Sequence, residues 1–425
     1  MKAVIVTNNL IPVFSGNGSS VYLWSFCRGL VKKKIEVHLV TYNFNLEKWI
    51  SYCNCTSLSE LKLQLLESQI YIHFSKELSI PSMSGIKNSY LGRAIFPRTE
   101  HYYQGFNHKI WVNNKLENIN PDIIFPYMVD AISAIQLYQE SHHKKCVALI
   151  TDMDHEVRKY RRIYSSNKSI LTKIKYLRNN IAERDLPNTS ISLLKQCSKI
   201  CCSAHHHVDW LIQNGIKNVK YFPVPVLDRP GNDWKVKQEL VMGNIVIPRI
   251  LLLGNVNGIA TLSGLYYLRN HLLVGLNKIN KKINFEVRIV GGGELDKKIK
   301  DNFDNYNWIK RIGFVENIQD EFFSSSIILV PTPIPLGFRT RIAEAFSYGA
   351  CVIAHYNNSF GMPELINNYN IVLAKNIKEF TSAIENCLSD KKYRDLIRMN
   401  ARSTYIQKYE GENTVKKMIE FSFNN

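Results

Sequence analysis

Pro-Leu-Gly-Phe-Arg-Thr-Arg-Ile-Ala-Glu-Ala-Phe-Ser-Tyr-Gly, residues 335–349, is the stretch of sequence that decides the fold. Its apolar and small residues recur at helical spacing, and short apolar runs flank it at residues 327–330 and 351–354. The pattern therefore predicts a strand, a Pro/Gly loop, a helix and another strand. Repeated strand–helix units of this kind build a parallel sheet that is covered by helices.

Two arginines and one glutamate give this stretch its chemical character. Arg339 and Arg341 fall at or just before the first turn of the predicted helix, where each cation opposes the helix dipole by roughly 0.3–1 kcal/mol. A bound anion would remove that conflict, because free backbone N–H groups already point outward there. Glu344 follows one turn later, so the set suits a nucleoside diphosphate. The alternative is an ordinary Arg341–Glu344 pair on a solvated helix face.

Length and composition set the broad class of protein. A chain of 425 residues predicts two domains, and 45% hydrophobic with 21% charged residues is typical of a globular protein. No apolar run approaches the roughly 20 residues that cross a bilayer, and the first residues resemble a strand more than a secretory signal. Nine irregularly spaced cysteines favour reduced thiols, so we expect a cytoplasmic protein.

No metal site is expected from the cysteines or histidines. The cysteines at 53 and 55, and those at 197, 201 and 202, lack a second matching pair with zinc-site spacing. His205, His206 and His207 are consecutive, and successive side chains point in different directions on a helix or a strand. We therefore expect these histidines to face solvent or to pack in the protein.

The net charge of +18 predicts attraction to anions such as phosphorylated substrates, membrane surfaces or nucleic acid. Residues 157–180 stand out, because they contain eight Lys or Arg, no acid and interleaved Ile, Leu and Tyr. A basic amphipathic helix of this kind favours contact with an anionic membrane surface, at about 1 kcal/mol per basic residue. The alternative is an ordinary domain helix with a solvated basic face.

Apolar runs without polar alternation predict strands that are buried on both faces. They lie at residues 3–7, 36–41, 69–73, 122–126, 146–151 and 198–202, and then at 250–253, 285–290, 308–312, 327–330 and 351–354. Helical patterns separate most of them, which predicts an α/β protein with two doubly wound parallel sheets. Ligands of such sheets bind at the carboxyl ends of the strands.

A stretch rich in proline and glycine, starting at residue 221, divides the two series of strands. We expect an N-terminal domain over 1–225, a linker over 226–245 and a C-terminal domain over 246–410. Residues 411–425 are expected to be helical and to pack back on the first domain. The two domains would face each other across a cleft.

Five segments of the second half resemble one family in their order and spacing. They are Leu-Leu-Leu-Gly-Asn (251–255), Val-Arg-Ile-Val-Gly-Gly-Gly (287–293), Ile-Gly-Phe-Val (312–315), Gly-Phe-Arg-Thr-Arg-Ile-Ala-Glu-Ala (337–345) and Ser-Phe-Gly-Met (359–362). The chain resembles the GT-B glycosyltransferases that use nucleotide-sugar donors with retention of configuration, and more narrowly the bacterial enzymes of surface polysaccharide assembly. The first half offers a looser match in Phe14-Ser-Gly-Asn-Gly-Ser-Ser and Thr151-Asp-Met-Asp-His-Glu.

The resemblance implies two Rossmann-like domains, the first binding acceptor and the second binding donor. Glu344 would accept hydrogen bonds from the ribose hydroxyls, and Arg341 would contact the donor diphosphate. The other residues implied at the donor are Gly254, Asn255, Phe314, Val315, Gly337, Phe338 and Arg339, while Gly16, Gly18 and Ser19 would lie near the donor phosphate or the acceptor. No cofactor or metal is implied besides the nucleotide-sugar co-substrate.

The sequence departs from the family pattern at two places. Leu336 stands where the family often has a second glutamate, so sugar selection would rest on backbone amides near Gly337 and Phe338. Residues 254–263 lack the Arg and Lys that often follow the first strand of the second domain. Arg339 and Arg341 are therefore expected to meet the diphosphate charge.

Asp154 and His155, after a predicted strand, are the candidate catalytic residues of the first half, beside Arg341 in the second. We expect Asp154 or His155 to orient the acceptor or to assist as a general base. Two alternatives stay open: Asp152 and Asp154 together hold Mg²⁺ with substrate phosphates, or an aspartate here caps the next helix. Arg341 would stabilise the departing diphosphate.

The sequence thus predicts a glycosyltransferase that moves a sugar from a UDP- or GDP-sugar to a lipid-linked or polysaccharide acceptor, with retention and without metal. It would be cytoplasmic and peripheral to the inner membrane. The alternatives are a nucleotide-sugar epimerase of the same fold, or a non-catalytic homologue that binds anionic lipid or nucleic acid. Nucleic acid is not expected as a partner, because no RNA-reading signature is present.

Overall fold

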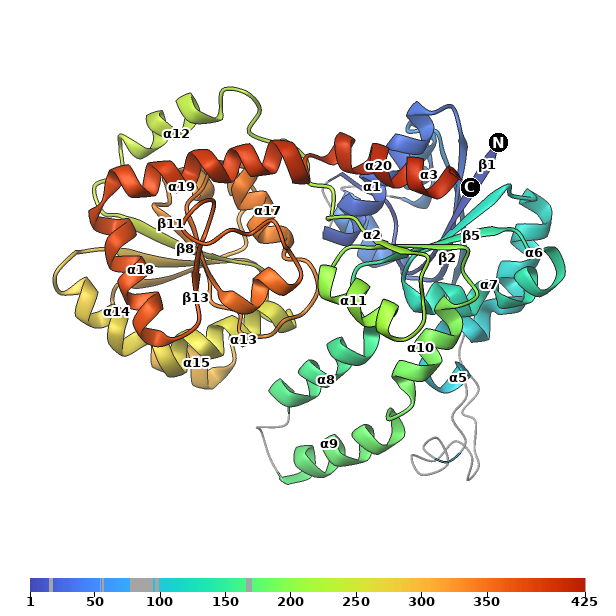
Figure 1. Ribbon diagram of the computed structural model, residues 1–425, viewed down its shortest axis with the longest axis horizontal. Helices are drawn as coiled ribbons and strands as arrows, with labels where there is room; N and C mark the ends of the chain where they lie inside the picture. The colour runs from blue at the N-terminus through green and yellow to red at the C-terminus, as the bar shows by residue number, and fades with distance from the viewer. Residues whose placement is uncertain are drawn as a thin grey trace. The chain divides into compact units, whose positions relative to one another are not determined.

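The computed structural model describes residues 1–14, 18–53, 55, 57–76, 95, 99–165 and 170–424. The chain forms two compact units, one of Met1–Pro225 with Glu412–Asn425 and the other of Val226–Gly411. Each unit contains one parallel sheet with helices packed on it (Figure 1). The predicted fold class, α/β with two doubly wound parallel sheets, is confirmed.

The first unit is built on a seven-stranded sheet in the order β3-β2-β1-β4-β5-β6-β7. Its neighbouring strands all pair in parallel. The central strands are buried along most of their length, as their unbroken apolar runs require. The strands are β1 Lys2–Asn8, β2 Glu36–Phe44, β3 Ile70–Lys76, β4 Ile123–Pro126, β5 Lys145–Ile150, β6 Lys199–Cys202 and β7 Val219–Tyr221.

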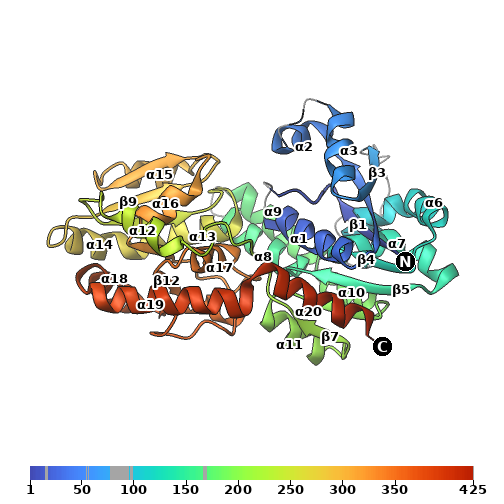
Figure 2. The same cartoon turned by 90° about the horizontal axis from the view of Figure 1, so that it is seen from above.

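The helices of the first unit lie on both faces of this sheet (Figures 1 and 2). They are α1 Gly18–Lys32, α2 Leu46–Cys53, α3 Leu58–Glu67, α5 Thr99–Tyr102, α6 Lys109–Ile119, α7 Met128–His142, α8 Asp154–Ser165, α9 Ile170–Ala182, α10 Leu186–Leu194, α11 His205–Gln213 and α20 Gly411–Phe423. The C-terminal α20 packs on α1, where a Cβ added to Gly29 would lie 2.2 Å from Val415 Cγ1. Phe423 also packs edge-on against Phe125 of β4.

The second unit has a six-stranded parallel sheet in the order β10-β9-β8-β11-β12-β13. The winding pattern is the same as in the first unit: strands are added on one side of the unit's first strand, and the later strands are added on its other side. Loops at such a reversal diverge at the carboxyl ends of the strands and leave room for a ligand. The strands are β8 Arg249–Leu253, β9 Glu286–Val290, β10 Ile309–Gly313, β11 Ile327–Val330, β12 Val352–His355 and β13 Val372–Ala374.

Helices also flank the second sheet, and α19 contacts both α17 and α18, while α18 packs against α14 (Figure 2). The helices are α12 Trp234–Met242, α13 Ile259–Tyr267, α14 Leu273–Asn280, α15 Lys297–Phe303, α16 Ile318–Ser324, α17 Thr340–Ser347, α18 Ile377–Ser389 and α19 Lys391–Thr404. The segment expected as a linker thus contains α12. Its Trp234 packs directly over Gly349, which leaves no space for a side chain there.

Candidate functional site

Three glycine-containing loops meet at the carboxyl ends of β8, β9 and β10. The Gly254 N–H donates to Val290 O at 2.9 Å, and the Gly291 N–H donates to Gly313 O at 2.7 Å. A third bond, from Val256 N–H to Gly292 O at 3.0 Å, joins the first two loops again. These backbone hydrogen bonds hold the loops that follow three neighbouring strands in one fixed surface.

Glycine is required at two points of this surface. Gly254 and Gly291 have φ angles of +134° and +140°, which side-chain-bearing residues rarely adopt. A Cβ on Gly291 would also lie 2.2 Å from Gly254 O, closer than any real contact. The loops therefore approach each other only because both positions lack side chains.

Arg341 lies next to these loops, in the first turn of α17. Its Nη2 donates a hydrogen bond to Thr261 Oγ1 at 2.8 Å, and a Cβ on Gly254 would come within 2.9 Å of the same nitrogen. Burial lowers the pKa of the Arg341 guanidinium to about 10, against an opposing effect of Glu344. Among the described residues, no carboxylate lies within ion-pairing distance of it. The geometry leaves a half-buried cation whose hydrogen bond goes to a neutral partner.

Glu344 follows Arg341 by one helical turn and is also half-buried. Burial raises the pKa of its carboxyl group, while Arg229 and Arg341 act in the opposite direction. The alternative of a solvated Arg341–Glu344 pair is therefore not what the structure has, because the two side chains make no direct ion pair within the described chain and neither is fully exposed.

Arg339 is buried and hydrogen-bonded within the loop that precedes α17. Its side chain is 6% exposed, and its guanidinium donates to Asn358 Oδ1 at 2.9 Å, to Ile334 O at 2.8 Å and to Leu336 O. These bonds fix the loop that leads into α17. Three guanidinium donors thus serve the protein's own oxygens, and the expectation that Arg339 meets the diphosphate charge stays a prediction.

The other predicted residues of this loop contribute backbone more than side chain. Leu336 is 4% exposed, and Phe338 is buried against Tyr409, with ring centroids 5.5 Å apart. Gly337 has a φ of +59°, which turns the chain sharply before α17. Any contact of this segment with a ligand would therefore come from its amides.

A cavity of about 600 Å³ lies at the ends of β9 and β10, beside the joined loops. It is lined by Val256, Ile289, Gly291, Gly293, Glu294, Leu295, Lys297, Lys300, Asp301, Arg311, Ile312 and Gly313. Of the predicted residues nearby, Phe314 is exposed and Val315 half-buried, while Asn255 is exposed and accepts the Asn257 N–H at 2.9 Å. Sequence reasoning missed Thr261 and the lysines of this lining, because neither carries a motif.

In the first unit, Asp154 is the opening residue of α8, directly after β5. Burial raises the pKa of its carboxyl group to about 6; Arg158 and a hydrogen bond from Tyr103 oppose this, while Asp130 and Asp152 add to it. Its Oδ2 is buried and has no hydrogen-bond partner in the described chain. That oxygen caps no helix, and whether another carboxylate oxygen of Asp152 or Asp154 does so stays open.

His155 and the described residues Gly18 and Ser19 of the predicted glycine loop lie near the same end of the sheet. Burial lowers the pKa of His155, whose ring packs on Trp210 with centroids 4.9 Å apart. Gly18 is the first residue of α1, and Ser19 hydrogen-bonds Tyr127. Gly16 lies outside the described residues.

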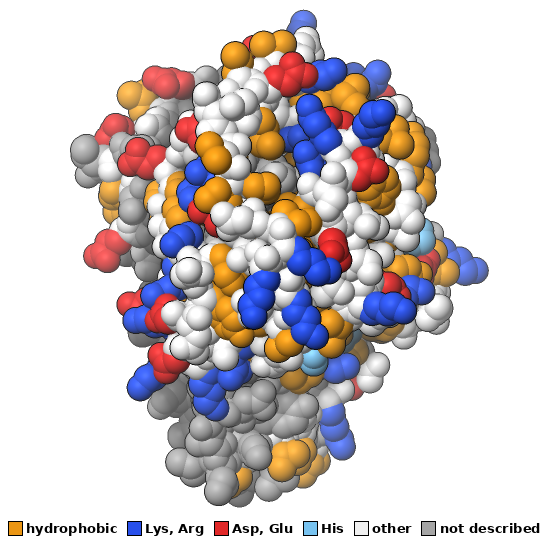
Figure 3. All heavy atoms as spheres, turned by 90° about the vertical axis from the view of Figure 1, so that its left-hand side faces the viewer, with side chains coloured by type: hydrophobic (Ala, Val, Ile, Leu, Met, Phe, Trp, Pro, Cys, Tyr) orange, Lys and Arg blue, Asp and Glu red, His pale blue; other side chains and the backbone are white. Residues whose placement is uncertain are grey.

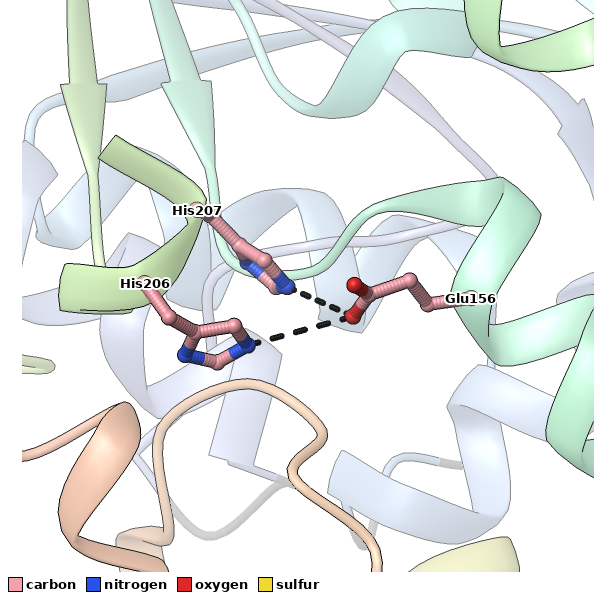
Figure 4. Close-up of side chains that lie close together, drawn as sticks. All are labelled: Glu156, His206 and His207. Atoms are coloured by element: carbon pink, nitrogen blue, oxygen red, sulfur yellow. Dashed lines mark hydrogen bonds and ion pairs between the residues drawn. The ribbon is translucent and has the colours of Figure 1, made fainter. Parts of the chain in front are cut away.

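Glu156, His206 and His207 form a cluster that the sequence did not predict (Figure 4). His207 Nε2 lies 2.9 Å from Glu156 Oε2, and His206 Nε2 lies 3.9 Å from the same oxygen. His205 instead turns away and pairs with Asp209 at 3.3 Å. His206 and His207, in the first turn of α11, both approach Glu156 of α8, although successive side chains of a helix point in different directions.

The basic segment 157–180 spans α8 and α9. Arg158 and Arg162 both pair with Glu183, which ties α8 to the end of α9. On α9 the apolar residues Ile174, Leu177 and Ile181 are exposed, with fractions of 57%, 62% and 49%. Within the described residues, no helix is both long and apolar enough to span a bilayer.

The chain is similar to known glycosyltransferases in sequence and in fold. Residues 248–390 match the model of the family described as glycosyl transferases group 1. HepE of Anabaena, solved with UDP, superposes with a TM-score of 0.67 at 13% identity over 99% of each chain. A glycosyltransferase of Rickettsia africae gives 0.67 at 16% identity over 99% of this chain and 98% of that one. The lipopolysaccharide galactosyltransferase WaaB gives 0.58 at 14% identity over 100% and 99%. No curated protein matches the sequence.

These matches define a GT-B fold. Residues 248–390, which match the glycosyl transferases group 1 model, contain the joined glycine loops, Arg341 and Glu344. This match and the GT-B fold support a glycosyltransferase.

Proposed function

We propose that the protein transfers a sugar from a UDP- or GDP-sugar to a lipid-linked or polysaccharide acceptor, with retention of configuration. The observation that carries the proposal is Arg341, a half-buried guanidinium that donates to neutral Thr261 beside glycine loops. Arg can bind phosphate through two parallel hydrogen bonds, and a diphosphate would restore the charge balance that burial disturbs.

The remaining donor contacts follow from the same surface. Glu344, one turn along α17, would accept hydrogen bonds from the ribose hydroxyls, and the cavity beside Gly313 would receive the base. Leu336 is apolar and buried, so the sugar would meet the amides around Gly337 in place of a carboxylate. As the bond to the sugar breaks, negative charge grows on the diphosphate, and one well-placed donor there contributes about 3–4 kcal/mol. The proposed contacts to the diphosphate include no metal ion.

In the first unit, Asp154 suits the handling of an acceptor hydroxyl. A carboxyl group with a pKa of about 6 exchanges its proton near neutral pH, and its buried Oδ2 is free to accept a hydrogen bond. His155, kept neutral by burial, would orient the same acceptor.

The HepE structures lend support, since they contain UDP, UDP with glucose, or UDP-glucose. Their identity to this chain is 12–14%, so the ligand comes to this protein only as part of the proposal. Figure 3 adds a further point: on the face it shows, Lys and Arg side chains are interspersed with uncharged ones and form no continuous basic track. That face therefore shows no extended basic surface of the kind that binds a nucleic-acid backbone.

The test is a panel of UDP-, GDP-, ADP- and CMP-sugars incubated with the intact chain, measuring released nucleotide and the sugar product. We expect nucleoside diphosphate release from a UDP- or GDP-sugar, and nothing from CMP-sugars, which lack a diphosphate. Release from no donor would contradict the proposal. An epimerised sugar still attached to its nucleotide would favour the epimerase alternative.

A lipid-linked acceptor requires access to a membrane, and α9 offers a surface for this. Its exposed Ile174, Leu177 and Ile181 lie at helical spacing, with basic residues including the exposed Arg178 among them. We propose that this face inserts into the headgroup region of an anionic bilayer, so that the protein works at the cytoplasmic side of the inner membrane.

Vesicle sedimentation tests the membrane contact. The chain should bind phosphatidylglycerol vesicles, bind neutral vesicles less, and lose binding as salt rises. Leu177→Ser should weaken binding several-fold, whereas Leu63→Ser, at an equally exposed leucine of α3, should not. Salt-independent binding, or equal effects of the two variants, would reject this surface.

A further inference from the structure

Three metal-ligating side chains converge at the carboxyl ends of β5 and β6, from helices that are far apart in sequence. Glu156 is on α8, and His206 and His207 are the second and third residues of α11 (Figure 4). Their potential ligand atoms lie within 4.8 Å of one another. The closest pair is His207 Nε2 and Glu156 Oε2 at 2.9 Å, and His206 Nε2 is 3.9 Å from that oxygen.

The cluster is removed from solvent, and most of its imidazole nitrogens are unsatisfied. The His207 side chain is 1% exposed, and those of His206 and Glu156 are 20% and 28% exposed. His207 Nδ1 and both ring nitrogens of His206 are buried without a hydrogen-bond partner in the described part of the chain. Buried polar atoms are normally bonded, so the arrangement implies an absent partner.

We propose that Glu156, His206 and His207 bind a divalent transition-metal ion of the zinc type. Two imidazoles and one carboxylate are a common zinc set, with bonds of about 2.0–2.2 Å. Ligands of a tetrahedral ion then lie about 3.4 Å apart, which is within the spread of the cluster. Small side-chain rotations would suffice, and a water or substrate oxygen would take the fourth position.

The geometry of the carboxylate agrees with this assignment. Glu156 Oε2 lies between the two imidazoles, 2.9 Å from His207 Nε2 and 3.9 Å from His206 Nε2. His155 is the other imidazole beside the cluster, and its ring packs on Trp210.

The ion would act as a clamp between α8 and α11. Glu156 follows Asp154 and His155 directly, so fixing its carboxylate fixes the first turn of α8 and the residues proposed to orient the acceptor. The site belongs to the first unit, whereas the proposed diphosphate contacts come from the second. The proposed ion would position α8, and it would not contact the donor diphosphate.

The test uses the intact chain with any affinity tag removed, stripped with a chelator and dialysed against Zn²⁺. Elemental analysis should find one ion per chain. Co²⁺ should give the intense visible absorption of a four-coordinate site. Glu156→Gln and the His206→Gln/His207→Gln double variant should weaken binding by roughly a hundredfold or more. His205→Gln, which removes the neighbouring exposed histidine, should leave it unchanged.

Circular dichroism and thermal unfolding of the metal-free chain report whether each variant has folded, and neither readout depends on nucleotide binding. Failure of the wild-type chain to bind Zn²⁺, or a six-coordinate Co²⁺ spectrum, would overturn the proposal. So would a loss of Zn²⁺ binding in His205→Gln as large as the loss in Glu156→Gln. If a variant fails to fold, the wild-type Co²⁺ spectrum alone still decides.

Discussion

The two sheets have the same winding of strands, but different groups form the surface at their carboxyl edges. In the second unit, backbone hydrogen bonds between Gly254, Gly291 and their neighbours form the surface, and α17 adds two charged side chains. In the first unit, the surface consists of titratable side chains from α8 and α11. A glycine-built site leaves a local pattern in the sequence, whereas a side-chain cluster is assembled from segments that carry no shared pattern.

Burial also acts on the key ionisable group at each edge in the same physical way. It lowers the pKa of Arg341 and raises the pKa of Asp154, in each case favouring the neutral form. A guanidinium stays charged near pH 7 in spite of this, but a carboxyl group with a pKa of about 6 does not stay fully charged. The second unit therefore offers a permanent cation for a diphosphate, and the first offers a group that exchanges its proton.

The largest expected effect separates the two arginines of the second edge. Arg341→Ala should lower turnover of the preferred nucleotide-sugar by about 10²–10³-fold, because it removes a donor from the departing diphosphate. The thermal midpoint should change little, since the hydrogen bond of Arg341 goes to one threonine hydroxyl. Steady-state kinetics and thermal unfolding give the two readouts.

Arg339→Ala is the matched contrast. It should lower the thermal midpoint, because three protein oxygens lose their donor. If Arg339→Ala reduced turnover as strongly as Arg341→Ala while leaving stability intact, the division of roles between these arginines would be wrong.

A smaller effect is expected from adding one methyl group to the glycine surface. Gly254→Ala should destabilise the chain by about 1–3 kcal/mol and weaken UDP binding, because its φ is +134° and its Cβ would meet Thr261 and Arg341. Gly292→Ala is the control, since nothing lies within 4 Å of a Cβ there. Urea unfolding and calorimetry would show the difference, and equal behaviour of both variants would contradict the proposed tight packing.

The smallest effect concerns Asp154 and pH. Its pKa of about 6 exceeds its ordinary value of 3.8, so proton binding stabilises the fold below about pH 4 and that stabilisation is lost as pH rises through 6. Relative to Asp154→Asn, the wild-type chain should lose about 1 kcal/mol of unfolding free energy between pH 4 and 7. Urea midpoints measured across this range test it, and parallel curves for the two proteins would refute the raised pKa.

The sequence predicted the fold class and the surface of the second unit for one physical reason. Strands buried on both faces are continuous apolar runs, and positive φ angles require glycine, so both leave marks in adjacent residues. Arg341 and Glu344 were found because they share one helix turn. The sequence did not indicate Thr261, because its hydrogen bond with Arg341 depends on α13 lying beside α17.

Burial and long-range contacts account for what the sequence did not predict. Nothing adjacent to Arg339 signals that Ile334, Leu336 and Asn358 would take its donors. The pairing of Glu156 with His206 and His207 joins residues about 50 positions apart. The exposure of Ile174 and Leu177 likewise follows from what packs on α9, and the helical spacing of the sequence indicates only that one face is apolar.

The central claim is that Arg341 and the glycine loops of the second unit bind a nucleoside diphosphate. Isothermal titration of the intact chain and of Arg341→Ala with UDP, GDP and inorganic phosphate tests it most directly. The account predicts that UDP or GDP binds in preference to phosphate and that Arg341→Ala weakens this binding at least about tenfold, or 1.4 kcal/mol. Absence of nucleotide binding, or the same affinity in the variant, would contradict it.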